Sequence, residues 1–308
     1  MKMTSRIVLV FMLMAVAACG SGGKKKFAYV ERPAEGLYAE AVEDLERKRY
    51  DRAIPLFEEV ERQHPYSPWA RRAMLMKAFA YYRQNDYDEA IAALDQFISL
   101  HPGNKDAPYA YYLKAISFYE QIRDVGRDQD FTNKAVAALT DVVRRYPSTE
   151  YARDARLKLD LTFDHLAGKE MYVGRFYLNA GKYIAAVNRF NTVVEQYQTT
   201  SHVPEAMHRL VETYMQIGVI EEAWKIAAVL GYNYPGSEWY QYSYNLLDNA
   251  GVLEPGSAPK PSVLRKAKDE EKEQKIRRPV DLDTPQLSPV DSDIGNNSPI
   301  PPANQLPD

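Results

Sequence analysis

Residues 50–65, YDRAIPLFEEVERQHP, carry the pattern that organises most of this 308-residue chain. Apolar residues recur in them every three or four positions and a proline ends the run, which is typical of an amphipathic helix and its stop signal. The pattern returns at residues 87–102, YDEAIAALDQFISLHP, with the tyrosine, alanine and final proline in the same places. The 37-residue separation of Ala53 and Ala90 predicts an array of repeated helical units.

Five copies of the pattern share an alanine, and in four of them a proline follows it by twelve positions. The alanines are Ala53, Ala90, Ala135, Ala186 and Ala223, and the prolines are Pro65, Pro102, Pro147 and Pro235. We expect each alanine on the second helix of an antiparallel pair, where a small side chain lets the first helix approach closely. The matching residues on the first helices are Ala41, Ala78, Ala115, Gly174 and Val211. This period predicts an all-α fold, a superhelix of five helix-pair tetratricopeptide (TPR) repeats.

Two of the spacings between repeats are longer than 37. Ala90 and Ala135 are 45 apart, and the extra residues fall in a polar segment, residues 122–131, which we predict to be a loop. Ala135 and Ala186 are 51 apart, and residues 151–180 between them contain no proline. The excess over 37 is close to four helical turns at about 3.6 residues per turn. We therefore predict one helix of about thirty residues linking repeats three and four.

The N-terminal residues 1–18 have the features of a lipoprotein signal peptide. A basic start precedes twelve uncharged residues, which would rise only about 18 Å as a helix and would not cross a membrane core of about 30 Å. The sequence Val-Ala-Ala-Cys, ending at Cys19, resembles the lipobox of bacterial lipoproteins. This resemblance implies cleavage before Cys19, an S-diacylglycerol and N-palmitoyl modification there, and anchoring in the membrane. An ordinary secretory signal with an incidental cysteine is the alternative.

Composition divides the rest of the mature chain. Residues 19–36 are predicted to be an acylated flexible tether, because they contain glycine, serine and lysine and precede the first repeat. Residues 251–308 hold ten of the nineteen prolines and no Phe, Tyr or Trp, so we expect a Pro-rich, charged, disordered tail. This tail is either solvated or contacts the cell wall or a partner.

The sequence shows no motif that is typical of a catalytic, metal or cofactor site. We expect no catalytic site, no metal and no cofactor, because there is no phosphate-binding loop, no nucleophile elbow and no paired-cysteine motif. His202 and His208 are six residues apart, a spacing that does not place both on one helix face. The formal net charge of -3 gives no sign of nucleic-acid binding.

Tyrosine is the abundant residue, with 23 copies, and a phenol ring with a polar tip suits protein-binding surfaces. The first helices of a TPR array line its concave groove. We therefore predict that Arg72, Phe79, Tyr82 and Arg83 of the second repeat grip a peptide in this groove. The alternative for each of them is ordinary packing.

Several stretches together resemble the BamD family, TPR lipoproteins of the outer-membrane β-barrel assembly machinery. They are LYAEA at residues 37–41, YDRAI at 50–54, AYY at 80–82, residues 170–177, and GKYIAAVNRF at 181–190. The last stretch is the most specific, because helix packing does not dictate Ala-Val-Asn-Arg. The resemblance covers residues 19–247, and the Pro-rich extension departs from it.

The resemblance implies a non-enzymatic scaffold on the periplasmic face of the bacterial outer membrane. Residues 37–121 would form the N-terminal TPR half, which contacts unfolded outer-membrane proteins. Residues 122–250 would form the C-terminal half, which docks the periplasmic domains of a BamA-type barrel protein beside accessory lipoproteins, with Arg189 as the named docking candidate. The alternatives are another periplasmic TPR lipoprotein, coordinating cell-wall or division proteins, and a lipid-anchored wall hydrolase, whose site is not found.

Overall fold

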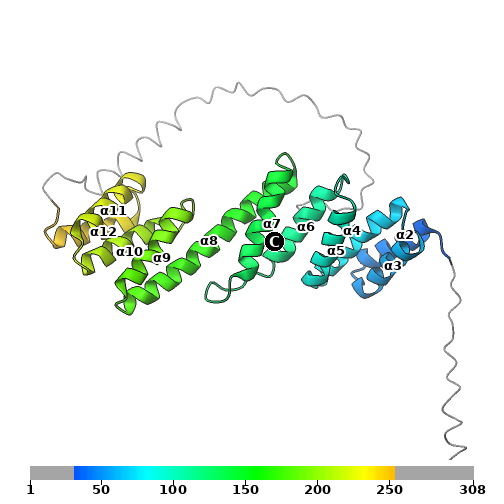
Figure 1. The fold of residues 1–308 in the computed structure, drawn as a ribbon, viewed down its shortest axis with the longest axis horizontal. Coiled ribbons are helices and arrows are strands. Elements are labelled where there is room, and N and C mark those ends of the chain that lie inside the picture. Colours follow the sequence, from blue (N-terminus) through cyan, green and yellow to red (C-terminus); the bar gives the residue numbers. More distant parts are fainter. Residues whose placement is uncertain (1–30, 254–308) are drawn as a thin grey trace, which may run out of the picture.

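A computed structural model describes residues 31–253 of the chain (Figure 1). The expected signal peptide, Cys19 and nearly all of the expected tail lie outside the described residues. Between residues 31 and 253 the chain forms eleven helices and no strand, in agreement with the predicted all-α class. The helices are α2 (Ala34–Glu46), α3 (Tyr50–Gln63), α4 (Pro68–Arg83), α5 (Tyr87–Leu100), α6 (Ala107–Tyr119), α7 (Asp130–Arg145), α8 (Glu150–Asn179), α9 (Tyr183–Gln196), α10 (Val203–Gln216), α11 (Ile220–Asn233) and α12 (Glu238–Asn249).

The helices pack on their neighbours in chain order and form an elongated array (Figure 1). From α2 to α11 they alternate as first and second helices, and the predicted small residues lie where they meet. All five alanines of the second helices are buried, as are the five matching residues of the first helices. The close approach that the sequence predicted at these positions is therefore confirmed.

The second helices end where the proline pattern predicts. α3 stops at Gln63, and His64 before Pro65 has a non-helical backbone with φ -134° and ψ 55°, as expected because proline disfavours helical geometry in the residue before it. Tyr197 takes nearly the same conformation, φ -123° and ψ 44°, although Gln198 follows it. The packing of the repeat therefore sets this turn even without the proline.

Helix α8 confirms the predicted long helix, since it contains 30 residues. The Thr149 side chain caps its start by accepting a hydrogen bond from the Ala152 N–H at 3.2 Å. Near the N-terminal end of α8, Ala152 packs in one buried cluster with residues of α4 to α7. In the second half Met171 packs in a different cluster with α9 and α10. One helix thus joins the two halves of the array (Figure 1).

Two further elements are the loop before α7 and the last helix, α12. The predicted polar loop lies between α6 and α7, where residues 120–129 form no helix. Helix α12 is a segment to which the sequence analysis assigned no helix. Its Tyr240 and Leu247 are buried against the last pair, so α12 covers the apolar end of the superhelix as a capping helix does in repeat proteins.

Candidate binding surfaces

Arg72, a predicted groove residue, lies beside two aromatic rings at the start of α4. Its guanidinium carbon is 5.3 Å from the centroid of the Trp69 ring, and the Trp69 centroid is 5.0 Å from that of Tyr38 in α2. The Tyr38 hydroxyl is buried without a hydrogen-bond partner among the described residues. Burial, partly opposed by the Arg72 charge, raises the pKa of Tyr38 to about 12. A partly exposed cation over an aromatic face is suited to binding a peptide.

Phe79 and Arg83 lie together near the other end of α4, with the Arg83 guanidinium carbon 5.9 Å from the Phe79 ring centroid. Both side chains are half-buried. Tyr82 differs, because it is only 3% exposed and packs in the core with Tyr109 and Leu113. Its hydroxyl bonds to Glu120, and burial raises its pKa. Tyr82 therefore holds the second repeat to the third, and we remove it from the predicted ligand contacts.

Trp69 and Tyr38 were not predicted from the sequence: Trp69 contacts the Arg72 guanidinium, and the buried Tyr38 packs against Trp69. Trp69 and Arg72 are three residues apart, a separation that places side chains on one side of a helix. This three-residue spacing is the sequence signal that places Trp69 beside Arg72. The contribution of Tyr38 comes from the neighbouring helix α2, and nothing in the local sequence of α4 indicates it.

Arg189, the predicted docking residue, lies on α9 and is partly exposed. One of its guanidinium nitrogens, Nη1, lies 3.0 Å from a carboxylate oxygen of Glu170 in α8. The structure does not bring Arg189 together with Arg72, because α9 and α4 belong to different halves of the array. Arg189 is thus part of a separate surface on the C-terminal half.

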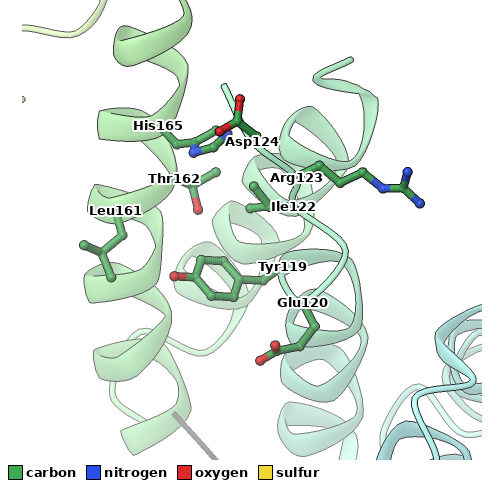
Figure 2. A pocket seen from close by; sticks show the side chains of 8 residues that line it. All are labelled: Tyr119, Glu120, Ile122, Arg123, Asp124, Leu161, Thr162 and His165. Atoms are coloured by element: carbon green, nitrogen blue, oxygen red, sulfur yellow. The ribbon is translucent and has the colours of Figure 1, made fainter. Parts of the chain in front are cut away.

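A pocket of about 430 Å³ lies between the end of α6, the loop after it, and the middle of α8 (Figure 2). Its wall residues are Tyr119, Glu120, Ile122, Arg123, Asp124, Leu161, Thr162 and His165. Figure 2 shows Tyr119 and Ile122 facing α8, while the Arg123 side chain points away. The Nε2 atom of His165 is buried and has no hydrogen-bond partner among the described residues. Burial raises the pKa of Glu120, opposed by Lys158 and the Tyr82 hydroxyl.

The described residues show no arrangement typical of a metal centre. Among residues 31–253 no three His, Cys, Asp or Glu side chains gather in a way that could hold an ion. His202 lies 3.5 Å from an Asp164 oxygen, whereas His208 is buried on α10 and bonded to Ser243. None of the described helices is long and apolar enough to span a membrane.

The chain is similar to known proteins over most of the array. The model of the YfiO family, described as outer membrane lipoprotein, matches residues 30–229. A protein of Caulobacter vibrioides named outer membrane protein assembly factor BamD is 50% identical over 249 residues, which cover 80% of this chain and 82% of that protein. The protein of the same name from Rickettsia prowazekii is 44% identical, over 81% of this chain and 99% of that protein.

Two further matches are more distant. A Neisseria meningitidis protein, also named BamD, is 33% identical over 75% of this chain and 91% of that protein. Among solved structures, a thermophilic TPR protein of Thermus thermophilus has a TM-score of 0.33 and 20% identity over 70% of this chain and 100% of that chain. On the family model and the curated relatives together, the chain belongs to the YfiO family of outer membrane lipoproteins, the family of the assembly factors named BamD.

Proposed function

We propose that this chain is a non-catalytic lipoprotein scaffold of the outer-membrane protein assembly machinery, held on the periplasmic face of the outer membrane by acyl chains on Cys19. The observation that carries the proposal is the 50% identity, over 80% of the chain, with a protein named outer membrane protein assembly factor BamD. The extended helical array supports a binding role, because repeat proteins present long surfaces that grip other chains.

The proposal divides the array between two kinds of partner. The N-terminal half, residues 37–121, binds unfolded outer-membrane proteins through the surfaces around Arg72 and Phe79. These surfaces offer aromatic faces and cations, the groups that bind an extended peptide by stacking and by charge. The C-terminal half, residues 122–250, docks the periplasmic domains of the barrel protein of the machinery, with Arg189 at the contact and accessory lipoproteins beside it.

Affinity purification of the tagged full chain from mildly solubilised membranes tests the proposal. We expect the barrel protein of the assembly machinery to be recovered with the chain. Recovery of cell-wall or division proteins in its place would establish the alternative, another periplasmic TPR lipoprotein. Recovery of the chain with neither group would contradict both functions.

Binding of unfolded substrate is tested on the purified chain. A urea-denatured barrel protein, diluted into buffer, should bind the chain less tightly after Arg72→Glu, because the substitution reverses the charge over Trp69. The matched control is Arg52→Glu, which reverses a charge on the exposed surface of the second helix α3. Equal effects of the two substitutions would indicate general electrostatics and would contradict a specific contact at Arg72.

A further inference from the structure

The second half of α8 can be compared residue by residue with α4. Gly174 and Ala78 hold the same small-residue position, 96 residues apart. Gly181 and Asn85 are separated by the same number, and both have a positive φ, 69° and 66°, in the turn to the next helix. The second half of α8 and helix α4 therefore lead into their partner helices, α9 and α5, in the same register. Residues that are 96 positions apart on α4 and α8 point in equivalent directions.

Phe176 occupies a position that is buried in α4, α6 and α10, the other first helices that have a helix pair before them. The equivalents are Ala80 in α4, Ser117 in α6 and Thr213 in α10, each 0% exposed. Ala80 belongs to the buried cluster that contains Phe57 of α3, so the preceding pair covers it. Phe176 is 63% exposed. The difference arises because α7, the helix that precedes α8, packs on the first half of α8 and leaves the second half without it (Figure 1).

Tyr172 extends the same uncovered face one turn earlier, since side chains four apart lie on one side of a helix. It is 53% exposed, whereas its equivalent in α4, Met76, is buried in the cluster with α3. The Lys169 ammonium lies 5.9 Å from the Tyr172 ring centroid. It donates a hydrogen bond to the Arg127 carbonyl and forms no ion pair with the residues that the structure describes.

The first helix of the array is an internal control for this face. No helix pair precedes α2 in the described residues, and there the equivalents of Tyr172 and Phe176 are Ala39 and Glu43, both exposed. On its uncovered face, α2 therefore carries a small residue and a carboxylate in place of the two aromatic rings. Two aromatic rings on the uncovered face of α8 expose apolar area that a solvated surface does not need.

We propose that Lys169, Tyr172 and Phe176 form a docking surface for an amphipathic helix of a partner protein. That helix takes the place that α3 has on α4. In α3 the buried residues of the shared cluster are Ala53, Ile54, Phe57 and Val60, so that large apolar residues follow Ala53 after one, four and seven positions. We expect the partner helix to carry this spacing, with an acidic residue that pairs with Lys169.

This surface is separate from the one at Arg189. Glu170, which pairs with Arg189, precedes Tyr172 by two residues, and residues two apart on a helix do not face the same way. The inference goes beyond the proposed function, because it follows from the uncovered face of α8 and would hold for an array of any cellular role.

Photo-crosslinking from the face itself tests the proposal. The full chain is made in its own cells with benzoylphenylalanine in place of Phe176, irradiated, and the crosslinked peptide is sequenced. We expect one product, whose crosslinked segment is a helix of another protein with apolar residues at the stated spacing. The matched control carries the probe in place of Tyr232, an 87% exposed aromatic residue on α11, and should not give this product.

A second measurement separates binding from folding. With the probe in place of Tyr172, the additional substitution Phe176→Glu should lower the yield of the product roughly tenfold or more, the effect of removing an aromatic anchor. Its thermal midpoint should not change, because the ring is mostly exposed. A crosslink to a second copy of the chain, a crosslink to residues 254–308 of the same chain, or no product at all would overturn the proposal. None of these results bears on whether the unmodified chain recovers the barrel protein.

Discussion

The ring of Phe190 in α9 fills the space that a side chain at Gly174 in α8 would occupy. A methyl group on Gly174 would come within 2.5 Å of one ring carbon and 2.8 Å of another, and Phe190 is fully buried. Glycine inside a helix is unfavourable by about 1 kcal/mol relative to alanine. The chain therefore accepts a local cost in α8 so that α9 can pack closely against it.

Gly174→Ala should lower the thermal midpoint of the chain. Forcing a methyl group into this contact costs about 1–3 kcal/mol, which exceeds the gain of about 1 kcal/mol in helix propensity. The matched control is Gly36→Ala in α2, where an added methyl group meets nothing within 4 Å and the midpoint should stay level or rise. A higher midpoint for Gly174→Ala, measured by circular dichroism, would contradict this account of the packing.

Tyr112 and Tyr109 are neighbouring core residues of α6 with opposite predicted responses to loss of the hydroxyl. Tyr112 donates a hydrogen bond of 2.5 Å to Asp154 in α8, whereas the Tyr109 hydroxyl is buried with no partner among the described residues. Tyr112→Phe should destabilise the chain by about 1.5–3 kcal/mol, typical of a bond to a charged group. Tyr109→Phe should leave the stability unchanged or raise it. Urea unfolding of both variants measures the difference, and equal losses would contradict it.

His208 makes the C-terminal end of the array sensitive to acid. The Ser243 hydroxyl donates to the Trp239 carbonyl, so its oxygen accepts a hydrogen bond from Nδ1–H of His208, at 2.9 Å. Burial, and then the Arg209 charge, lowers the pKa of His208 below its ordinary value of 6.5, while Glu205 and Glu212 oppose this shift. The folded chain therefore favours the neutral imidazole.

The sign of the pH effect follows from linkage. Because the folded-state pKa is depressed, the stability contributed by neutral His208 is present above pH 6.5 and is lost as the pH falls through the folded-state pKa. His208→Gln should remove this component, so the difference in thermal midpoint between the chain and the variant should shrink from pH 8 to pH 5. The other histidines are common to both proteins and cancel in the comparison. A constant difference would contradict the linkage.

The sequence could predict those features that depend on repetition. Four of the five second helices end two residues before a proline. Helix α8 matches the predicted bounds within one residue, because an insertion of four helical turns keeps the buried side in register. Tyr82 shows the limit of this reasoning. Inner first helices such as α4 contact both the preceding and the following pair, so the helical period alone does not tell a groove residue from a residue that faces the next pair.

Contacts between distant residues could not be predicted in this way. The pairing of Arg72 with Trp69 is local, but Tyr38 joins them from another helix, and Glu170 reaches Arg189 across the turn between α8 and α9. The uncovered aromatic face of α8 required the structure as well. Phe176 falls at a position where the helical pattern predicts a core residue, and only the structure shows that the described residues leave it 63% exposed.

Cys19→Ser tests the anchor, which lies outside the described residues. A serine hydroxyl does not replace the thiol that receives the diacylglycerol, so the variant should lack acyl chains and leave the membrane fraction. Mass spectrometry of the N-terminal peptide and fractionation of the cells measure both effects. Unchanged membrane fractionation would favour the ordinary secretory signal and a different means of attachment.

Arg189→Glu tests the docking surface, with a compensating swap that separates partner binding from packing within the chain. The single substitution places a carboxylate beside Glu170 and removes the only ion pair that Arg189 makes within residues 31–253. We expect roughly tenfold or greater loss of the co-purified barrel protein, the size typical of a charged anchor at an interface. The double variant Arg189→Glu with Glu170→Arg restores an ion pair between the two helices and leaves the partner facing the wrong charge. Recovery of the barrel protein should therefore stay low in the double variant. If the swap restores recovery, Arg189 acts by holding α9 to α8, and the predicted contact with the partner is wrong.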